Sequence, residues 1–449
     1  MRKLVFSEAL LPDGWRRDVR IEIQADGRIA SVTPDAEPGR LVALPGLPNL
    51  HSHAFQRGMA GLTEHAGDSE DSFWTWRELM YRFLAHLTPD DVEAIATLAY
   101  AEMLEAGFTR VGEFHYLHHA PDGSRYADHA EMAARIAAAA ATTGINLTLL
   151  PCFYAHGEIG GAPPVPGQRR FLNDLDSFAA LAEGSRRAIA ALPGATFGLA
   201  PHSLRAATIE EIRAVRAMAH RDEPLHIHAA EQVKEVEAAQ RILGQPPIAA
   251  LLDAGLVDAR TCLIHATHGT AAELARVADA RAVIGLCPVT ESNLGDGTFP
   301  AISYRAASGR FGVGTDSNVL ISAPAELRTL EYSQRLAHRT RNALAPRGGS
   351  TAVALWQAAL TGGAQALAAA PAGIAPGAFA DLVLLDPAAP ALAARHGDRI
   401  LDSLVFAARD GAISEVWVRG ARVVEAGAHP ARAAAERRVA AVLTRILAA

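Results

Sequence analysis

Eight short apolar runs, separated by stretches with helical signals, constrain the fold of this chain more than any other feature of its sequence. The runs are rich in β-branched or aromatic residues, which suits strands that are buried on both faces. Eight such units in this length predict an α/β protein with a TIM-type (β/α)8 barrel rather than an open doubly wound sheet. The runs cover residues 41–51, 108–115, 145–154, 196–202, 224–229, 261–266, 282–287 and 311–316.

Helix start signals lie between these runs. Thr88 followed by Pro89 places a capping hydroxyl before a proline at the first helical position. Thr208 and Glu211 have the spacing of a capping box. No glycine-rich phosphate loop follows the first run, so a dinucleotide-binding sheet is disfavoured.

The two ends of the chain differ from its middle. Residues 1–40 and 380–427 contain short alternating runs and turn signals, which are typical of strands and hairpins. We expect the termini to pair into one small β-sandwich beside the barrel. The predicted division is a composite β-sandwich domain of residues 1–44 and 375–449, and a metal-dependent barrel of residues 45–374.

Charge and cysteine content exclude several classes of protein. The chain has 42 basic and 49 acidic residues, a net charge of −7, and no long basic run, so nucleic acid and anionic membranes are not expected partners. The 3 cysteines lie scattered in apolar segments, which indicates a reduced, cytoplasmic protein. We find neither a signal-peptide core nor an apolar run of about 18 residues that would suggest a membrane span. A homodimer is the expected oligomer, because it is the commonest.

Polar residues follow the predicted strands where each strand ends. His51-Ser52-His53 closes the first run and projects both imidazoles to one side. In a barrel, the carboxyl ends of all strands meet on one face. Three histidines and one aspartate there can hold Zn²⁺ or Fe²⁺ and leave a position for water. The later strand ends carry residues 113–116, His202, His228, Glu231, His265 and Asp316. Four other histidines near strand ends are expected to face solvent or to lie behind the metal ligands: His118, His119, His156 and His268.

Several motifs resemble those of the amidohydrolase superfamily, and together they cover nearly the whole chain. Residues 45–54, which contain His51 and His53, resemble its opening motif. The other motifs are His228-Ala229-Ala230-Glu231, similar to the strand-5 motif of its deaminases, then His265, Cys287-Pro288 with residues 293–297, and Gly314-Thr315-Asp316-Ser317. The resemblance implies the barrel fold and one divalent metal ion, bound by His51, His53, His228 and Asp316. The strand-4 lysine that bridges two metals in other branches is absent, and residues 200–205 stand there instead.

Within the superfamily, three segments resemble the deiminases that act on N-formimino-L-glutamate in histidine degradation. They are residues 55–57, 115–116 and 202–205. Such a substrate carries two carboxylates, and planar arginine side chains bind carboxylates best. We expect Arg205 to bind one carboxylate, with hydrogen bonds from Gln56, Tyr116 and His202.

The second carboxylate has two candidate partners, Arg77 and Arg82. Both could equally be surface arginines that cover apolar area. A deaminase of a purine or another ring remains an alternative, because Trp74 and Trp76 could stack on a ring. A non-catalytic barrel that retains a metal site is disfavoured by Glu231 beside the ligands.

The resemblance implies metal-assisted hydrolysis of a C=N bond. In this mechanism Asp316 and His265 orient and help to deprotonate the attacking water, and Glu231 moves a proton to the imino nitrogen. Ammonia leaves and N-formyl-L-glutamate remains. Two alternatives stay open: Glu231 could only hold His228, and His265 could be a fourth histidine ligand.

Overall fold

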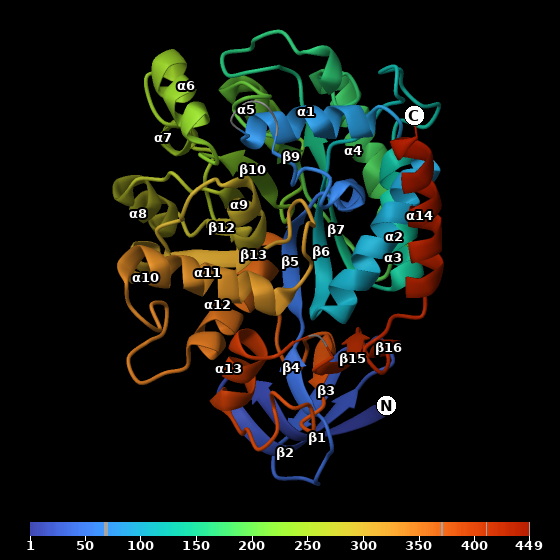
Figure 1. Cartoon of the computed structure of the whole chain (residues 1–449), viewed down its shortest axis with the longest axis vertical. Coiled ribbons are helices and arrows are strands. Elements are labelled where there is room, and N and C mark those ends of the chain that lie inside the picture. The colour runs from blue at the N-terminus through green and yellow to red at the C-terminus, as the bar shows by residue number, and fades with distance from the viewer. Residues whose placement is uncertain (67–70, 370, 410, 449) are drawn as a thin grey trace.

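The computed structural model describes residues 1–66, 71–369, 371–409 and 411–448, and these residues form a parallel barrel above a terminal sheet (Figure 1). The barrel strands pair in the orders β5-β6-β7-β8 and β10-β11-β12-β13, while β9 pairs with β7. Isolated bridges from Ser203 to His228 and from Ser52 to Asp316 join the two groups. The predicted barrel is therefore confirmed. Its strands are β5 (Leu47–Ser52), β6 (Phe108–His115), β7 (Asn146–Phe153), β8 (Thr196–Phe197), β9 (Ala200–Pro201), β10 (Leu225–Ala229), β11 (Thr261–His265), β12 (Val283–Leu286) and β13 (Arg310–Val313).

Helices cover the outside of the barrel. The side chain of Thr88 caps α2, and Thr208 and Glu211 form a reciprocal capping box on α5, as the sequence predicts. The helices of the barrel are η1 (Ala54–Met59), α1 (Phe73–Leu84), α2 (Pro89–Glu105), α3 (Glu131–Thr143), η2 (Pro166–Gln168), α4 (Leu175–Ile189), α5 (Ile209–Ala217), α6 (Val233–Leu243), α7 (Pro247–Asp253), α8 (Ala271–Asp279), α9 (Pro288–Leu294), α10 (Ala301–Ala306), α11 (Ala323–His338) and α12 (Thr351–Ala366). No helix among the described residues is long and apolar enough to cross a membrane.

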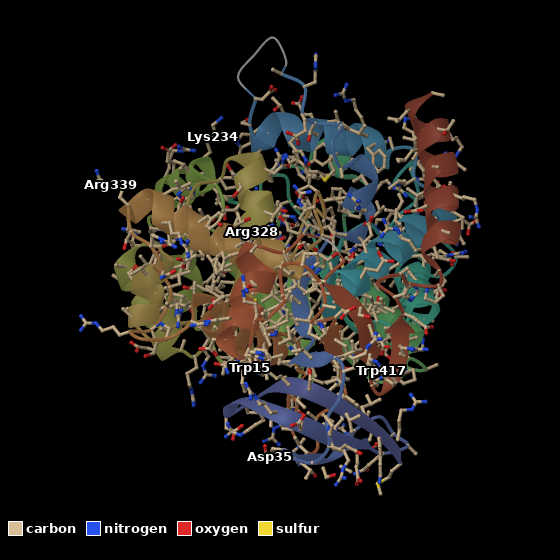
Figure 2. All side chains as sticks on the ribbon, turned by 60° about the horizontal axis from the view of Figure 1, so that its bottom comes forward. Trp15, Asp35, Lys234, Arg328, Arg339 and Trp417 are labelled. Carbon is tan, nitrogen blue, oxygen red and sulfur yellow. The ribbon has the colours of Figure 1, made fainter. Side chains whose placement is uncertain are left out.

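Both ends of the chain contribute to one seven-stranded sheet, in the order β16-β15-β14-β4-β1-β2-β3. This sheet is the small β domain that the sequence predicts. One of its faces buries an apolar cluster of its own, which includes Phe6, Ile21 and Leu384. Trp15 packs instead against the barrel core and lies where the sheet meets the barrel (Figure 2). The strands are β1 (Arg2–Leu11), β2 (Gly14–Ile23), β3 (Ile29–Thr33), β4 (Val42–Pro45), β14 (Leu382–Leu385), β15 (Ile413–Val418) and β16 (Ala421–Val424).

The run at residues 41–51 was expected to be one strand, and the structure divides it into β4 and β5. Gly46 lies between them, and its backbone N–H donates to the carbonyl of Asp381 at 2.9 Å. A Cβ atom at Gly46 would lie only 2.2 Å from Cγ2 of Thr109, so the close approach requires glycine. The chain therefore passes from the terminal sheet directly into the barrel.

Two further segments differ from the sequence interpretation. The run at residues 196–202 is divided into β8 and β9, because the backbone N–H of Leu199 between them donates to the carbonyl of Pro224. The segment 380–427 was expected to hold only strands and hairpins, but it includes α13 (Asp398–Phe406). Apolar residues of α13 at helical spacing, such as Ile400, Leu401 and Leu404, are buried against the main core.

The last helix, α14 (Arg432–Leu447), packs against α2 of the barrel. Arg432 forms ion pairs with Glu105 at 2.6 Å and with Glu102 at 3.1 Å. The Glu105 carboxylate also accepts the backbone N–H of His429 at 2.8 Å. The C-terminal segment thus contacts both the sheet and the barrel, and the division into residues 1–44 with 375–449 and 45–374 stays a prediction.

We predict that Gly362→Ala destabilises the protein, although alanine normally favours a helix. A Cβ atom at this position of α12 would lie 2.0 Å from the backbone carbonyl oxygen of Phe311 in β13. Overpacking of this kind costs about 1–3 kcal/mol. Thermal melting measures the effect, with the exposed neighbour Thr361→Ala as the matched control. Equal melting temperatures for the two variants would contradict the tight contact between α12 and β13.

Two buried histidines of the barrel strands predict loss of stability in acid. Burial lowers the pKa of His115 to about 3 and that of His226 to about 4. The unfolded chain takes up these protons near pH 6.5, so the free energy of unfolding should fall as the pH drops from about 6.5 towards 4. Each histidine contributes a slope of at most about 1.4 kcal/mol per pH unit.

Denaturant unfolding at several pH values measures this slope. His226 Nε2 lies 2.8 Å from the carbonyl oxygen of Ala366, and glutamine can make the same hydrogen bond without titrating. We therefore expect the free energy of unfolding of His226→Gln to fall less steeply below pH 6.5 than that of the unaltered protein. Identical slopes would contradict a neutral, buried His226.

Candidate metal centre and active site

Four buried side chains converge at the carboxyl ends of the barrel strands. His51 lies in β5 and His53 directly after it, His228 lies in β10, and Asp316 follows β13. Their ligand atoms all lie within 4.8 Å of one another. Asp316 Oδ1 is 3.3 Å from His51 Nε2 and 3.2 Å from His53 Nε2, and the Nε2 atoms of His51 and His228 are 3.1 Å apart. Nitrogen and oxygen ligands lie about 2.0–2.2 Å from zinc, so ligand atoms about 3 Å apart can share a single ion.

The backbone fixes which nitrogen of two of the imidazoles, those of His53 and His228, faces the centre. His53 Nδ1 lies 2.8 Å from the carbonyl oxygen of Phe114, and His228 Nδ1 lies 2.9 Å from that of His202. Each Nδ1–H donates to its carbonyl, which leaves the Nε2 lone pair free for an ion. The donor set is thus oriented before any ion is present.

Burial sets the charges of the four groups. It lowers the pKa of His51 to about 3 and that of His228 well below the usual value. Burial also tends to raise the pKa of Asp316, but hydrogen bonds and charge interactions with His51 and His53 hold it well below its usual range. Neutral His51 and His228, together with the His53 imidazole and the Asp316 carboxylate, form a donor set for a divalent transition metal.

His265 lies beside this centre among three carboxylates. Its Nε2 is 4.0 Å from Asp316 Oδ2 and 3.9 Å from Glu231 Oε1, and its Nδ1 is 3.3 Å from Glu291 Oε1. Burial alone would lower the pKa of His265, but Glu231, Glu291 and Asp316 raise it to about 10. The imidazole can therefore hold a proton next to the centre.

Arg205 and Glu231 form a buried ion pair of 2.8 Å. The sequence predicts that Arg205 binds a carboxylate and that Glu231 moves a proton, but nothing in the sequence indicates that the two side chains touch. The Nε of Arg205 is buried and has no hydrogen-bond partner among the described residues, so the guanidinium keeps a free donor. Glu235 accepts the backbone N–H groups of Ala230 and Glu231 at 3.2 Å each, which holds the turn after β10 in place.

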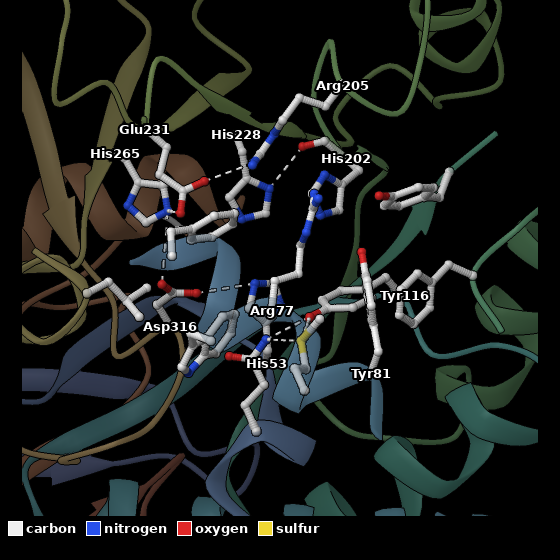
Figure 3. Close-up of a pocket in the computed structure, with 17 residues that line it drawn as sticks. His53, Arg77, Tyr81, Tyr116, His202, Arg205, His228, Glu231, His265 and Asp316 are labelled. Atoms are coloured by element: carbon white, nitrogen blue, oxygen red, sulfur yellow. Dashed lines mark hydrogen bonds and ion pairs between the residues drawn. The ribbon is translucent and has the colours of Figure 1, made fainter. Parts of the chain in front are cut away.

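A pocket of about 570 Å³ opens beside the four-residue group (Figure 3). The expected substrate-binding residues all line it: Gln56, Tyr116, His202 and Arg205. Gln56 Nε2 donates to the Tyr116 hydroxyl at 2.6 Å, and Gln56 Oε1 is buried without a hydrogen-bond partner among the described residues. The pocket thus combines charged, hydrogen-bonding and aromatic groups.

The structure distinguishes between the two arginines and between the two tryptophans that the sequence offers as pocket residues. Arg77 lines the pocket, whereas Arg82 of the same helix is not among the lining residues. Trp76 also lines it, whereas Trp74 lies outside, with the guanidinium of Arg77 4.5 Å from its ring centre. The histidines assigned to outer positions, His118, His119, His156 and His268, do not line the pocket either.

Sequence reasoning missed much of the pocket wall. The missed residues are Phe73, Met80, Tyr81, Tyr154, Phe171 and Leu294. Tyr154 directly follows β7, so its place at a strand end was a usable signal. The others lie on helices or loops whose approach to the barrel mouth depends on tertiary packing. Asn318 was missed too, and its amide donates to the carbonyls of His53 and Asp316 at 3.1 Å each.

Comparisons with known proteins agree with this architecture. Residues 42–423 match the model of the Amidohydrolase family, and residues 3–40 match the model described as Formimidoylglutamate deiminase HutF, N-terminal domain. Formimidoylglutamate deiminase of Pseudomonas aeruginosa is 49% identical over 99% of both chains. 8-Oxoguanine deaminase of the same organism is 30% identical over 84% of both chains.

Solved structures share the fold over the whole chain. An amidohydrolase from Brucella melitensis has a TM-score of 0.96 and 52% identity, and the match covers 100% of both chains. A zinc-bound adenosine deaminase from Xanthomonas campestris, with a TM-score of 0.82, 23% identity and coverage of 100% and 98%, is similar in fold alone. The family match over most of the barrel and the converging histidines and aspartate lead to one conclusion: this chain belongs to the amidohydrolase family.

Proposed function

We propose that this chain hydrolyses N-formimino-L-glutamate to N-formyl-L-glutamate and ammonia, as a deiminase of histidine degradation. The observation that carries the proposal is that two arginines, Arg77 and Arg205, line the same pocket as the metal-binding group. Two guanidinium groups beside a metal centre suit a substrate with two carboxylates and a C=N bond. The 49% identical relative bears the name of this activity.

Substrate binding follows from the free donors of the pocket. In our proposal Arg205 binds one carboxylate through the side of its guanidinium that Glu231 does not occupy, since its Nε has no partner among the described residues. Arg77 lies at the pocket wall over the ring of Trp74 and binds the second carboxylate. Gln56, Tyr116 and His202 add hydrogen bonds. The two ends of the substrate would then hold its formimino group near the metal-binding residues.

The residues around the centre account for the proton transfers. When bound, the divalent ion supplies a nucleophilic hydroxide near neutral pH. Asp316 takes up the proton of the attacking water, and His265, whose Nε2 lies 4.0 Å from Asp316 Oδ2, orients the water and holds a proton beside it. Glu231 carries a proton to the imino nitrogen. The C–N bond to that nitrogen then breaks, ammonia leaves, and the carbon keeps the oxygen as an N-formyl group.

The ion pair of 2.8 Å gives Arg205 a second effect on the chemistry. It orients Glu231, so the residue that binds the substrate also positions the residue that moves the proton. Binding of the correct dicarboxylate is thereby coupled to the placement of the catalytic carboxylate. A neutral ring substrate would not engage Arg205 in this way.

The proposal also covers the resident metal ion, the location and oligomeric state of the protein, and its domain bounds. We propose Zn²⁺ as the resident ion, with Fe²⁺ as the alternative, because three imidazoles and one carboxylate are donors that both ions accept. We also propose a cytoplasmic homodimer that does not bind nucleic acid. The proposed domains are residues 1–44 with 375–449, and 45–374.

Release of ammonia from N-formimino-L-glutamate by the metal-loaded protein is the direct test. We expect N-formyl-L-glutamate as the co-product, loss of turnover after chelation, and recovery when Zn²⁺ is added back. Formamide and glutamate as products would show that a different bond is cleaved. If there is no turnover with a verified metal content, the substrate assignment is wrong and purine-type rings become the next substrates to test.

Substitution of arginines tests how the substrate is bound. We predict that Arg77→Met raises KM with little change in kcat, whereas Arg205→Met lowers kcat as well, because Glu231 loses its partner. Loss of one charged hydrogen bond corresponds to about 10–150-fold in kcat/KM. Arg82→Met on the same helix is the matched control and should leave both constants unchanged. Equal effects of the Arg77 and Arg82 variants would refute the assignment of Arg77.

A further inference from the structure

A second group of possible metal ligands lies next to the first. His265, Cys287 and Asp316 are all buried, and their ligand atoms lie within 4.8 Å of one another. His265 ends β11, and Cys287 follows β12 and precedes α9. Figure 3 shows His265 beside Glu231 and Asp316, on the side of the pocket away from Tyr81 and Tyr116. The group combines an imidazole, a thiol and a carboxylate, and nothing in the proposed mechanism uses the thiol.

Asp316 belongs to both groups but presents a different oxygen to each. Its Oδ1 faces His51 and His53, at 3.3 and 3.2 Å. Its Oδ2 faces His265 Nε2 at 4.0 Å. A carboxylate in this position can bind one ion through each oxygen. The first centre can therefore stay complete while a second ion uses Oδ2.

Glu291 contacts both His265 and Cys287 of the second group. Its Oε1 lies 3.3 Å from His265 Nδ1 and accepts the backbone N–H of Cys287 at 2.8 Å. Because Glu291 takes the Nδ1–H of His265, the Nε2 atom is turned towards Asp316. Glu231 Oε1, 3.9 Å from the same Nε2, is near enough to serve as a fourth ligand. Ligand atoms on a tetrahedral ion are about 3.4–3.6 Å apart, so only small movements are required.

From this geometry we infer that His265, Cys287 and Asp316 form a second binding site for a thiophilic divalent cation such as Zn²⁺, Co²⁺ or Cd²⁺. The thiol of Cys287 and the imidazolium of His265 each lose one proton to solvent as the metal–sulfur and metal–nitrogen bonds form, so the step needs no oxidant or reductant. Imidazole, thiolate and carboxylate are all accepted by these ions. Mg²⁺, which prefers oxygen ligands, is not expected to bind there.

The second site binds more weakly than the first. A cysteine thiol is mostly protonated near neutral pH, so the ion has to displace a proton from Cys287. Affinity should therefore rise with pH, as it does for sites whose ligands must first be deprotonated. The first centre contains no thiol, so it has no such requirement.

Occupation of the second site should inhibit the enzyme. This part of the inference rests on the proposed function, in which His265 and Glu231 handle protons. An ion on His265 Nε2 replaces the proton that this nitrogen holds in the proposed mechanism, and it also withdraws Asp316 Oδ2. Activity should then rise with the first equivalent of Zn²⁺ and fall as Zn²⁺ is added in excess.

Cobalt titration of the full chain, freed of metal by a chelator, tests the site without any assay of activity. We expect the first equivalent of Co²⁺ to give visible absorption from a site without sulfur. The second should add the near-ultraviolet band of a cobalt–thiolate bond. Cys287→Ser should abolish only that band. Cys262→Ser, which replaces another buried free cysteine, is the matched control and should retain it.

The inference is wrong if no thiolate band follows saturation of the first site, or if the band survives in Cys287→Ser. Cys287→Ala is a second variant in case serine disturbs the fold, and thermal melting reports folding in each case. In the activity assay, half-inhibition of Cys287→Ser should require at least about tenfold more Zn²⁺ than the unaltered protein. Equal inhibition would overturn the inhibitory role. A complete lack of turnover would count against the proposed function, while the cobalt titration would still decide the site.

Discussion

The contact between Asp316 and the segment His51–His53 is the one on which the rest of the structure depends. The backbone N–H of Asp316 donates to the carbonyl of His51 at 3.0 Å, and the N–H of His53 donates to the carbonyl of Asp316 at 2.9 Å. These hydrogen bonds join the end of the last barrel strand to the end of the first. The same three residues present their side chains to the metal centre. The hydrogen bonds that close the barrel therefore also bring three of the four candidate metal ligands together.

This coupling explains why so many polar groups are buried at the barrel mouth. Unpaired buried charge would be strongly unfavourable, but Glu231 is compensated by Arg205, and Asp316 lies against His51 and His53 where a divalent cation would compensate it. Asn318 adds amide hydrogen bonds to the backbone on both sides of the closure. The resulting network leaves little freedom in the side chains that have to meet an ion and a substrate.

Much of this arrangement could be predicted from the sequence, because it depends on local pattern and topology. Alternation of strand and helix signals predicts the barrel, and a barrel places every strand end on one face. His51, His53, His228 and Asp316 could thus be grouped although they lie up to 265 positions apart. The position of His202, Arg205 and Gln56 in the pocket follows from the same rule, together with the family resemblance.

What could not be predicted depends on contacts between side chains of distant segments. The pairing of Arg205 with Glu231, the choice of Arg77 over Arg82 and the aromatic wall with Phe171 are examples. Helical spacing leaves both arginines of α1 possible, and only the packing of that helix across the barrel mouth distinguishes them. The division of the first run at Gly46 was also hidden, because an apolar strand looks the same whether it pairs in one sheet or in two.

The positions of the chain ends have a practical consequence. The N-terminal strand lies in the sheet at the end of the molecule opposite α1, whereas α14 extends back along the barrel towards the level of α1 (Figure 1). Since α1 carries residues of the pocket wall, the two ends are unequal as attachment points. A support or fusion partner joined through the N-terminus would leave the pocket mouth open to diffusing substrate. A support or fusion partner joined after α14 would lie beside the pocket mouth.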